Sequence, residues 1–150
     1  MARGMRLSRH TDYALRVLMH VAVRGDGSSS IPEIARAYVI SEEHLRKVVH
    51  SLGKAGFIAT QRGRGGGIRL GRPTVEINLG SVVRHTEDSF RLVPCPECLI
   101  APVCLLPGML NEAVEAFLAV LDKYTLADLS VPRRDLRLLF GFDDEVAVGP

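Results

Sequence analysis

The hydrophobic pattern of the first half of the chain predicts three helices. The first begins near Thr11, a plausible N-cap, and runs through DYALRVLMHVAV until GDGSSS ends it. Its apolar face is formed by Leu15, Leu18, Met19 and Ala22. This spacing is typical of a helix that packs one side against a core.

Two shorter helices follow, with only the tight turn VI between them. In IPEIARAY, Pro32 stands at an early helical position and Ile34 and Ala35 point inward. Ser41 caps EEHLRKVVHSLGKAG, whose two glutamates suit the positive end of the helix dipole and whose Gly56 marks its end. Two short helices joined by a tight turn form a helix-turn-helix.

The period then changes to that of a β-hairpin. FIATQR and GIRL have the pattern of strands, and GRGGG between them is a glycine-rich turn. A helix-turn-helix that is followed directly by a basic two-stranded hairpin is a winged helix.

The second half predicts helices on both sides of a proline-rich loop. A short helix, LGSVVRHTED, follows Asn78. The next segment contains Pro94, Pro96 and Pro102, with Pro107 just beyond, and prolines at this density exclude a regular helix. After Pro107, GMLNEAVEAFLAVLDKYTLADL predicts one long helix.

That long helix carries two neighbouring apolar stripes. They are Leu110, Val114, Phe117, Leu121 and Tyr124, and beside them Met109, Ala113, Ala116 and Val120. So broad a surface predicts two partners, its own domain and a second copy of the chain, which makes this a dimerisation helix. In the tail from Val131, RRDLRLLF predicts a loosely docked helix before a disordered acidic end.

The fold class predicted from these elements is mainly α. We expect a winged helix-turn-helix DNA-binding domain over residues 1–77, a loop and dimerisation helix over 78–130 and a tail over 131–150. The composition, 47% hydrophobic and 24% charged, is that of a folded protein. Neither a membrane span nor a secretory signal is visible, so we expect a cytoplasmic protein without a membrane partner.

Charge divides the chain and supports DNA as the partner. Residues 1–75 hold 13 Lys or Arg against 5 Asp or Glu, whereas residues 76–150 hold 6 against 12, although the whole chain carries only +2. A basic front half indicates contact with a polyanion. On the third helix Leu45, Val48, Val49 and Leu52 should face the core, which leaves the opposite face, including Glu42, for a DNA groove.

The wing adds Arg62 and Arg64, whose glycine neighbours let the backbone approach a phosphate or a narrow minor groove. The simpler interpretation is that these charges only solvate the surface. Because helix-turn-helix, wing and regional charge agree, we interpret them as a DNA-binding surface. The residues predicted to contact DNA are Ser41, Glu43, His44, Arg46, Lys47, His50, Arg62 and Arg64. No phosphate-binding loop or nucleophile motif is visible, so we do not expect an enzyme.

All three cysteines lie in the stretch CPECLIAPVC, at Cys95, Cys98 and Cys104. An odd number of thiols in a reducing compartment argues against a disulfide framework, and a proline-rich loop offers little core to join. A thiol redox switch, a zinc site completed by the nearby His85 and an iron–sulfur cluster remain. The spacing alone leaves zinc and a cluster equally open.

Several segments resemble the NsrR/IscR-type winged-helix iron–sulfur transcription regulators, over a range from about Met5 to Leu129. They are LSRHTDYALRVLMHVA, ISEEHLRKVVHSLGKAGFIATQRGRGGGIRLGRP, the cysteine loop and FLAVLDKYTLADL. TDYALR, RGRGGGIRL and the cysteines just before the long helix are the most specific parts. GGIRLGRP and LDKYTLADL resemble the nitric-oxide-sensing branch, and CLLPGMLNEAV lacks the histidine that IscR-like members carry after the last cysteine.

The resemblance implies a homodimer in which each cysteine loop holds one iron–sulfur cluster near the partner's first helix. Its ligands would be Cys95, Cys98, Cys104 and Asp12 of the partner subunit. A carboxylate is a weak partner for this iron, so one corner would stay exchangeable. The cluster is expected to be [4Fe-4S], with [2Fe-2S] as the alternative, because the two residues between the cysteines of CPEC are fewer than in the family pattern.

The function implied is that of a repressor. A dimer braced by the cluster would bind a palindromic operator in double-stranded DNA, and nitric oxide would dismantle the cluster and release the DNA. Two alternatives remain open. One is an iron-sensing or redox-sensing [2Fe-2S] regulator, and the other is a constitutive DNA-binding protein with structural zinc.

Overall fold

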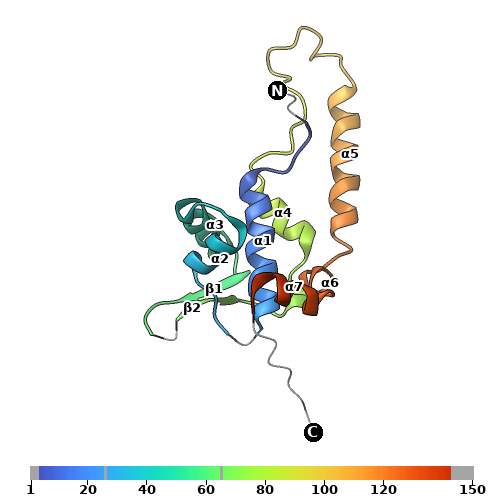
Figure 1. Ribbon diagram of the computed structural model, residues 1–150. Coiled ribbons are helices and arrows are strands. Elements are labelled where there is room, and N and C mark those ends of the chain that lie inside the picture. Colours follow the sequence, from blue (N-terminus) through green and yellow to red (C-terminus); the bar gives the residue numbers. More distant parts are fainter. Residues whose placement is uncertain (1–3, 26, 65, 143–150) are drawn as a thin grey trace.

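The computed structural model describes residues 4–25, 27–64 and 66–142, and most of its regular structure is helical (Figure 1). The elements in chain order are α1 (Arg9–Arg24), α2 (Ile31–Tyr38), α3 (Glu42–Lys54), β1 (Ile58–Gln61), β2 (Gly67–Leu70), the 3-10 helix η1 (Thr74–Glu76), α4 (Leu79–Thr86), α5 (Leu106–Leu121), α6 (Leu126–Leu129) and α7 (Arg133–Phe140). The predicted order of helices, hairpin and helices is confirmed.

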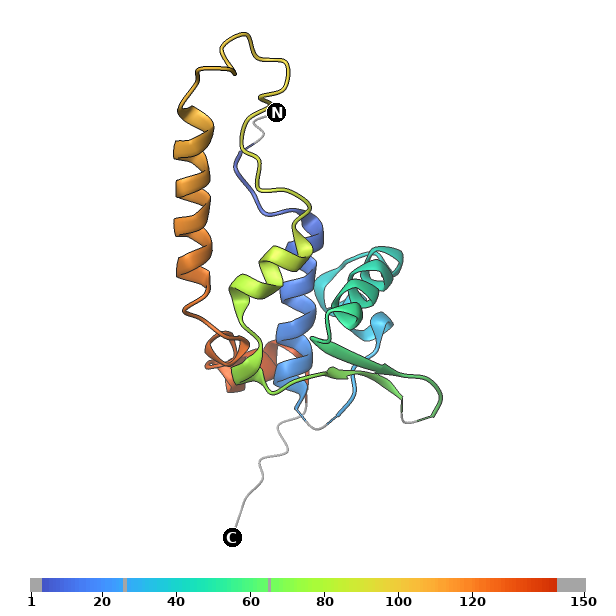
Figure 2. The same cartoon turned by 180° about the vertical axis from the view of Figure 1, so that it is seen from behind.

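Helix α1 is the centre of the fold. It contacts α3 and β2 on one side and α4, α6 and α7 on the other, and Figures 1 and 2 show these elements grouped around it. Its buried apolar residues join those of α2, α3, the hairpin and α4 in one core. Ala14, Val17 and Leu18 are completely buried, as a helix covered on both sides requires.

The first helix begins earlier than its sequence predicts. Ser8, and not Thr11, is the N-cap, because the Ser8 hydroxyl accepts a hydrogen bond from the Thr11 amide at 3.2 Å. The Thr11 side chain is buried, and its hydroxyl accepts a hydrogen bond from Thr86 of α4 at 2.9 Å. A hydroxyl that serves a tertiary contact has the same sequence signal as one that caps a helix.

The helix-turn-helix forms as predicted. Ser30 and Glu33 make a capping box at the start of α2. Val39 is the C-cap of this helix, and its backbone lies in the left-handed region with φ 55°. Ser41 caps α3. The four residues predicted to face the core from α3 are all buried, and they are Leu45, Val48, Val49 and Leu52.

The wing is an antiparallel pair, β1 and β2, in which Ile58 stands opposite Leu70 and Gln61 opposite Gly67. Ile68 points into the core. A third segment joins it, because Ser29, before α2, forms a bridge with Ile68. The predicted hairpin is confirmed, while the bridge from the serine segment was not predicted.

The prediction of one long helix from Pro107 to Leu129 is wrong. Helix α5 starts at Leu106, so Pro107 lies within its first turn, where its missing N–H costs nothing, and the helix ends at Leu121. A new helix, α6, begins because Thr125 and Asp128 form a capping box. Between them the chain runs beside η1 and α4, where the Tyr124 carbonyl accepts from the Leu79 amide at 3.0 Å. Tyr124 is therefore not part of the α5 stripe.

Helix α5 stands away from the main body in both views, with the proline-rich loop at its upper end (Figures 1 and 2). Leu118 is its only buried residue, and it belongs to neither predicted stripe. Met109, Phe117 and Val120 are 61%, 45% and 49% exposed. None of the helices over the described residues has the length and apolarity to cross a membrane.

The predicted tail helix exists as α7 and docks on the lower end of α1. Its Phe140 and the following Phe142 pack against the ring of His20, with centroids 4.8 and 5.0 Å away. The acidic stretch beyond, predicted to be disordered, lies outside the described residues.

Burial of His20 makes the stability of the fold depend on pH. Its side chain is completely buried, and burial lowers its pKa below the usual 6.5; Glu33 opposes this shift and Arg24 adds to it. The unfolded chain binds a proton at this site below about pH 6.5 while the folded chain does not. We therefore expect the free energy of unfolding to fall as the pH drops from 7.5 to 5.5, and to fall less in His20→Gln. Denaturant unfolding across this range measures both slopes, and identical slopes would contradict the assignment.

Candidate nucleic-acid interface and cysteine loop

The exposed face of α3 carries most of the residues predicted to contact DNA. Arg46, Lys47 and His50 are exposed there. Arg46 pairs with Glu42 at 3.0 Å and Lys47 with Glu43 at 3.9 Å, both one helical turn apart. Exposed pairs of this kind contribute little to stability, so a phosphate can replace the carboxylate as the partner of either cation.

Two of the predicted residues also have roles in the fold. The Ser41 hydroxyl accepts from the His44 amide at 3.4 Å and so caps α3. The half-buried His44 ring meets Tyr13 of α1 edge-on, with centroids 4.7 Å apart. These contacts fix the start of α3 on α1, and with it the direction in which the exposed face points.

At the tip of the wing, Arg62 and Arg64 are exposed, as predicted. The backbone there is tight: a Cβ at Gly66 would overlap the Gln61 carbonyl oxygen, and Gly67 has φ +143°. Only glycine fits both positions. The sequence did not predict the structural role of Arg72. Its guanidinium donates to the Ala55 carbonyl at 2.7 Å and lies over the Phe57 ring. These contacts join the end of the hairpin to the end of α3.

The cysteines lie on the loop that leads from α4 to α5, as the prolines predict. Two successive turns shape it, because the Cys98 amide donates to the Cys95 carbonyl at 3.1 Å and the Ala101 amide to the Cys98 carbonyl at 3.2 Å. All three thiols are free, with Cys98 exposed and Cys95 and Cys104 half-buried. Cys95 also lines a cavity of about 390 Å³ between this loop and the start of α5.

The structure does not bring the predicted metal ligands together in one chain. No group of three or more His, Cys, Asp or Glu over residues 4–25, 27–64 and 66–142 could hold a metal ion. Asp12 lies in the first turn of α1 and accepts from the Arg16 guanidinium at 3.0 Å. His85 lies on α4 with Nε2 2.9 Å from the Ser51 carbonyl oxygen, a contact that needs the Nε2 hydrogen.

The start of the loop is anchored to the beginning of α1. At its start, the Ser8 amide donates to the Glu87 carboxylate at 2.6 Å and Thr86 bonds to Thr11, which ties the end of α4 to the beginning of α1. Sequence reasoning missed these contacts, because serine and threonine are common in loops and caps. The loop therefore leaves the body next to the first turn of α1, where Asp12 lies.

Beyond the loop, the far end of α5 is fixed by an ion pair. Arg84 of α4 donates two hydrogen bonds to Asp122, at 2.6 and 2.8 Å. These bonds hold the pKa of the Asp122 carboxyl below its usual value. A Cβ at Gly80 would overlap this carboxylate, so glycine lets α4 and the end of α5 approach. The loop and α5 thus form one connected arm on α4.

A family model described as Rrf2, iron-dependent transcriptional regulator, matches residues 7–132 of this chain. A Bacillus subtilis (strain 168) protein named HTH-type transcriptional regulator NsrR is 51% identical over 141 residues, which are 90% of this chain and 97% of that protein. Among solved structures, CymR, the global cysteine regulator of B. subtilis, aligns with a TM-score of 0.64 and 29% identity over 85% of this chain and 97% of that one.

The structure of T. potens IscR aligns with a TM-score of 0.69 and 27% identity, over 86% of this chain and 88% of that one. These similarities confirm the predicted resemblance and the mainly α winged-helix fold. Because the relatives are regulators, they also confirm that the chain is not an enzyme. The individual DNA-contacting residues and metal ligands stay predictions.

The exposed wing arginines give the first prediction on DNA. Arg64→Ala is expected to weaken binding to duplex DNA and to lower the slope of log affinity against log salt by about one, since one phosphate contact is lost. Fluorescence anisotropy with a labelled duplex at several salt concentrations measures the slope. Lys123→Ala is the matched control, because Lys123 is exposed just after α5, and α5 lies across α1 from the wing (Figure 1). Equal slopes in the two variants would remove Arg64 from the interface.

Proposed function

Because the chain belongs to the Rrf2 family of iron-dependent transcriptional regulators, we propose that it is a homodimeric repressor whose iron–sulfur cluster senses nitric oxide. The observation that carries the proposal is the position of the three free thiols. They lie on a loop that is tied at its start to the first turn of α1, the helix on which the DNA-binding elements pack.

DNA is the partner that the surface favours. The exposed face of α3 and the wing arginines lie on the same side of α1, and the basic residues of the chain are concentrated in this half. A recognition helix with a basic wing is a standard combination for reading one groove and holding the flanking backbone. A dimer would place two such units on the two halves of a palindromic operator.

The cysteine loop fits an iron–sulfur cluster by the chemistry of its donors. Cys95, Cys98 and Cys104 supply three free thiols, and thiolates are the usual ligands of such clusters. When bound, a [4Fe-4S] cluster would supply an iron site that is reactive toward nitric oxide. Asp12 of the partner subunit would supply the fourth ligand. In the single chain the partly exposed Asp12 carboxylate pairs with Arg16.

The residues of the chain explain how a change at the thiols would reach the DNA-binding face. Cys95, Cys98, Cys104 and the partner's Asp12 would hold the loop and α1 of the two subunits together when a cluster is bound. Once the thiolates were released, the loop would still be tied to α1 through Glu87 and Thr86. Since Tyr13 of α1 contacts His44 of α3, movement of α1 alters the start of the recognition helix.

Homodimerisation is supported by the exposed apolar side of α5. The helix is mostly exposed in the single chain, and its side chains include Met109, Phe117 and Val120. An apolar surface of this kind marks an interaction site on a folded protein. A second copy is the occupant that brings Asp12 from another chain to the loop.

The zinc alternative is weakened by His85. This residue is the one nearby histidine that could complete a three-cysteine zinc site, and its Nε2 is engaged by Ser51 while its ring packs near Phe57. An iron-sensing or redox-sensing [2Fe-2S] regulator would use the same thiols, and the positions of the thiols therefore do not separate it from the proposal. The iron and sulfide content per chain and the response of DNA binding to nitric oxide do separate the two.

Anaerobic purification of the full chain tests the cluster directly. We expect a coloured protein with iron and sulfide near four of each per chain, as a [4Fe-4S] centre requires. Its affinity for a duplex enriched from a random-sequence pool should fall by about tenfold or more after nitric oxide is added. A colourless, zinc-loaded protein that binds DNA equally well before and after nitric oxide would contradict the proposal.

Two variants test individual cluster ligands with the same measurements of iron, sulfide and response to nitric oxide. Cys95→Ala should lose the iron, the sulfide and the response to nitric oxide together. Asp12→Ala should keep the fold and bind the cluster less stably, visible as faster loss of its absorbance. Asp135→Ala is a control at another first-turn aspartate, exposed on α7, and its cluster absorbance should behave like that of the wild type. An unchanged absorbance spectrum and decay rate in Asp12→Ala would remove Asp12 from the ligands.

The dimer gives a separate prediction. Val120→Glu places a charge on the exposed apolar side of α5, and an interface that buries it must leave the carboxylate unpaired. We expect the dimer dissociation constant in analytical ultracentrifugation to rise by about tenfold or more. Val39→Glu is the matched control, because Val39 is 93% exposed in the turn before α3. Equal dissociation constants in the two variants would place the interface elsewhere.

A further inference from the structure

The last helix, α7, lies beyond the residues that the family model matches, yet it docks on the DNA-binding half of the chain. The match ends at residue 132, and α7 begins at Arg133. It packs on the lower end of α1, on the side that α6 also covers (Figures 1 and 2). Neither the cysteine loop nor the α5 surface uses it.

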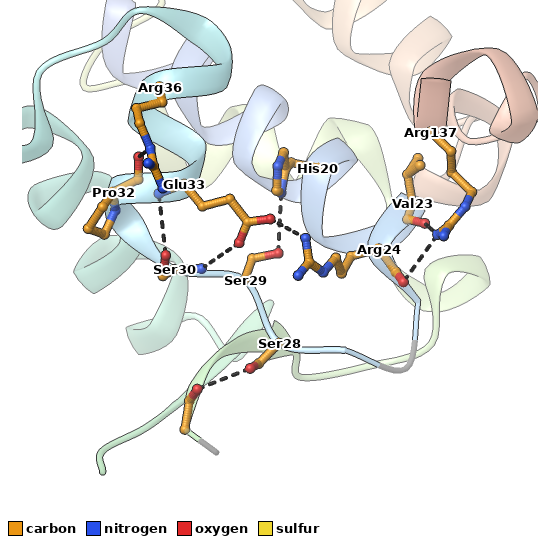
Figure 3. A network of polar contacts seen from close by, with 11 residues as sticks. His20, Val23, Arg24, Ser28, Ser29, Ser30, Pro32, Glu33, Arg36 and Arg137 are labelled. Atoms are coloured by element: carbon orange, nitrogen blue, oxygen red, sulfur yellow. Dashed lines mark hydrogen bonds and ion pairs between the residues drawn. The ribbon is translucent and has the colours of Figure 1, made fainter. Parts of the chain in front are cut away.

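Two arginines of the α7 helix close the C-terminus of α1. Arg137 donates to the Val23 carbonyl at 3.0 Å, and Arg133 donates to the Ala22 carbonyl at 3.3 Å. Figure 3 shows Arg137 pointing at the Val23 carbonyl from the side of α7. The last carbonyls of a helix lack partners within it and carry the negative end of its dipole, so a guanidinium there is favourable. These bonds fix α7 on α1.

Aromatic side chains at the end of α7 then enclose His20 of α1. The Phe140 and Phe142 ring centroids lie 4.8 and 5.0 Å from that of His20, and the imidazole is completely buried. Its Nε2 has no hydrogen-bond partner. Arg24 also lies over the Phe142 ring, 4.6 Å from its centroid, and pairs with Glu33 at the start of α2. The tail therefore contacts Arg24, and Arg24 in turn joins the end of α1 to the start of α2.

From His20 the contacts continue into the wing. Its Nδ1 lies 3.2 Å from the Ser29 hydroxyl oxygen, and Figure 3 shows the two side chains pointing at each other. The Ser29 amide donates to the Ile68 carbonyl at 3.0 Å, and the Ile68 amide donates to the Ser29 carbonyl at 2.7 Å. Ser28 next to it donates to the Gly66 carbonyl at 3.0 Å. The serine segment thus behaves as a third strand along the wing.

We infer that the C-terminal segment from Arg133 to Phe142 positions the wing for DNA. Its aromatic end packs His20 against Ser29. Two backbone hydrogen bonds join Ser29 to Ile68 of β2, and the turn before β2 carries Arg62 and Arg64. Phe142 and His20 are positioning residues in this scheme and do not touch the DNA. The inference rests on the proposed DNA binding and adds a residue set, outside the family match, on which affinity depends.

The test compares Phe142→Ala with Leu139→Ala in the full chain, purified anaerobically. Phe142 is 9% exposed, whereas Leu139, on α7 three residues earlier, is 82% exposed and serves as the matched control. The probe is the duplex enriched by the wild-type protein from a random-sequence pool. We expect Phe142→Ala to bind it about three- to tenfold more weakly, and Leu139→Ala to bind it like the wild type.

Two readouts separate wing positioning from a general loss of stability. Hydrogen exchange at the Ile68 amide should become faster in Phe142→Ala at a temperature where the chain stays folded. In double-mutant cycles the effect of Phe142→Ala should shrink when Arg64 is already Ala, because both act through the wing. It should add fully to that of Lys47→Ala on α3. Unchanged Ile68 exchange, or full additivity with Arg64→Ala, would overturn the inference.

A further variant covers the case in which Phe142→Ala does not fold. Ser29→Ala removes the hydroxyl that meets His20 and leaves the backbone bridge and α7 in place, so it should show the same faster exchange and weaker binding. Wild-type behaviour of Ser29→Ala would also overturn the inference. If the wild-type protein enriches no duplex, the proposed function fails, and the Ile68 exchange rates still decide whether α7 holds the wing.

Discussion

Burial of α1 on both of its sides is the constraint from which the rest of the structure follows. A helix with apolar residues around much of its circumference must be covered by several elements, and here they come from both halves of the chain. The helix-turn-helix and wing cover one side, and α4, α6 and α7 cover the other. The helix-turn-helix, the wing and the helices that flank the cysteine loop are therefore all joined to α1, most of them through one core.

Periodicity allowed the elements of this core to be predicted from the sequence. The short helices α2, α3 and α4 have strong signals at both ends, such as Pro32, Ser41 and Asn78, and each formed where the pattern indicated. The prediction of helix boundaries failed where the same residue type can either cap a helix or make a tertiary hydrogen bond. Thr11 looks like a cap but bonds to Thr86, which is 75 positions away, and no local pattern contains that information. The break in the long helix combines a local signal that was missed, the capping box of Thr125 and Asp128, with contacts to η1 and α4 that no local pattern contains.

For the candidate site, the sequence predicted the types of functional side chain but not the long-range contacts that position them. Three thiols on a proline-rich loop and a basic helix with a basic wing are visible as composition and spacing, because those properties belong to short segments. The anchoring of the loop by Glu87 and the capture of His85 by Ser51 depend on residues far apart in the chain. The role of Ser29 was missed for the same reason, since a buried serine and a loop serine look alike in the sequence.

The two ends of α1 are held by different sets of contacts, and each set leads toward the proposed DNA-binding face. At its beginning, Ser8 and Thr11 tie the cysteine loop to the turn that contains Asp12. At its end, Arg137 and the His20 cluster tie the tail to the wing. Because α1 is buried and contacts both α3 and β2, a change at either end would reach them through packed side chains. In the proposed scheme the tail would set the resting position of the wing, and the loop would hold the recognition helices in register, so the affinity for DNA would depend on both.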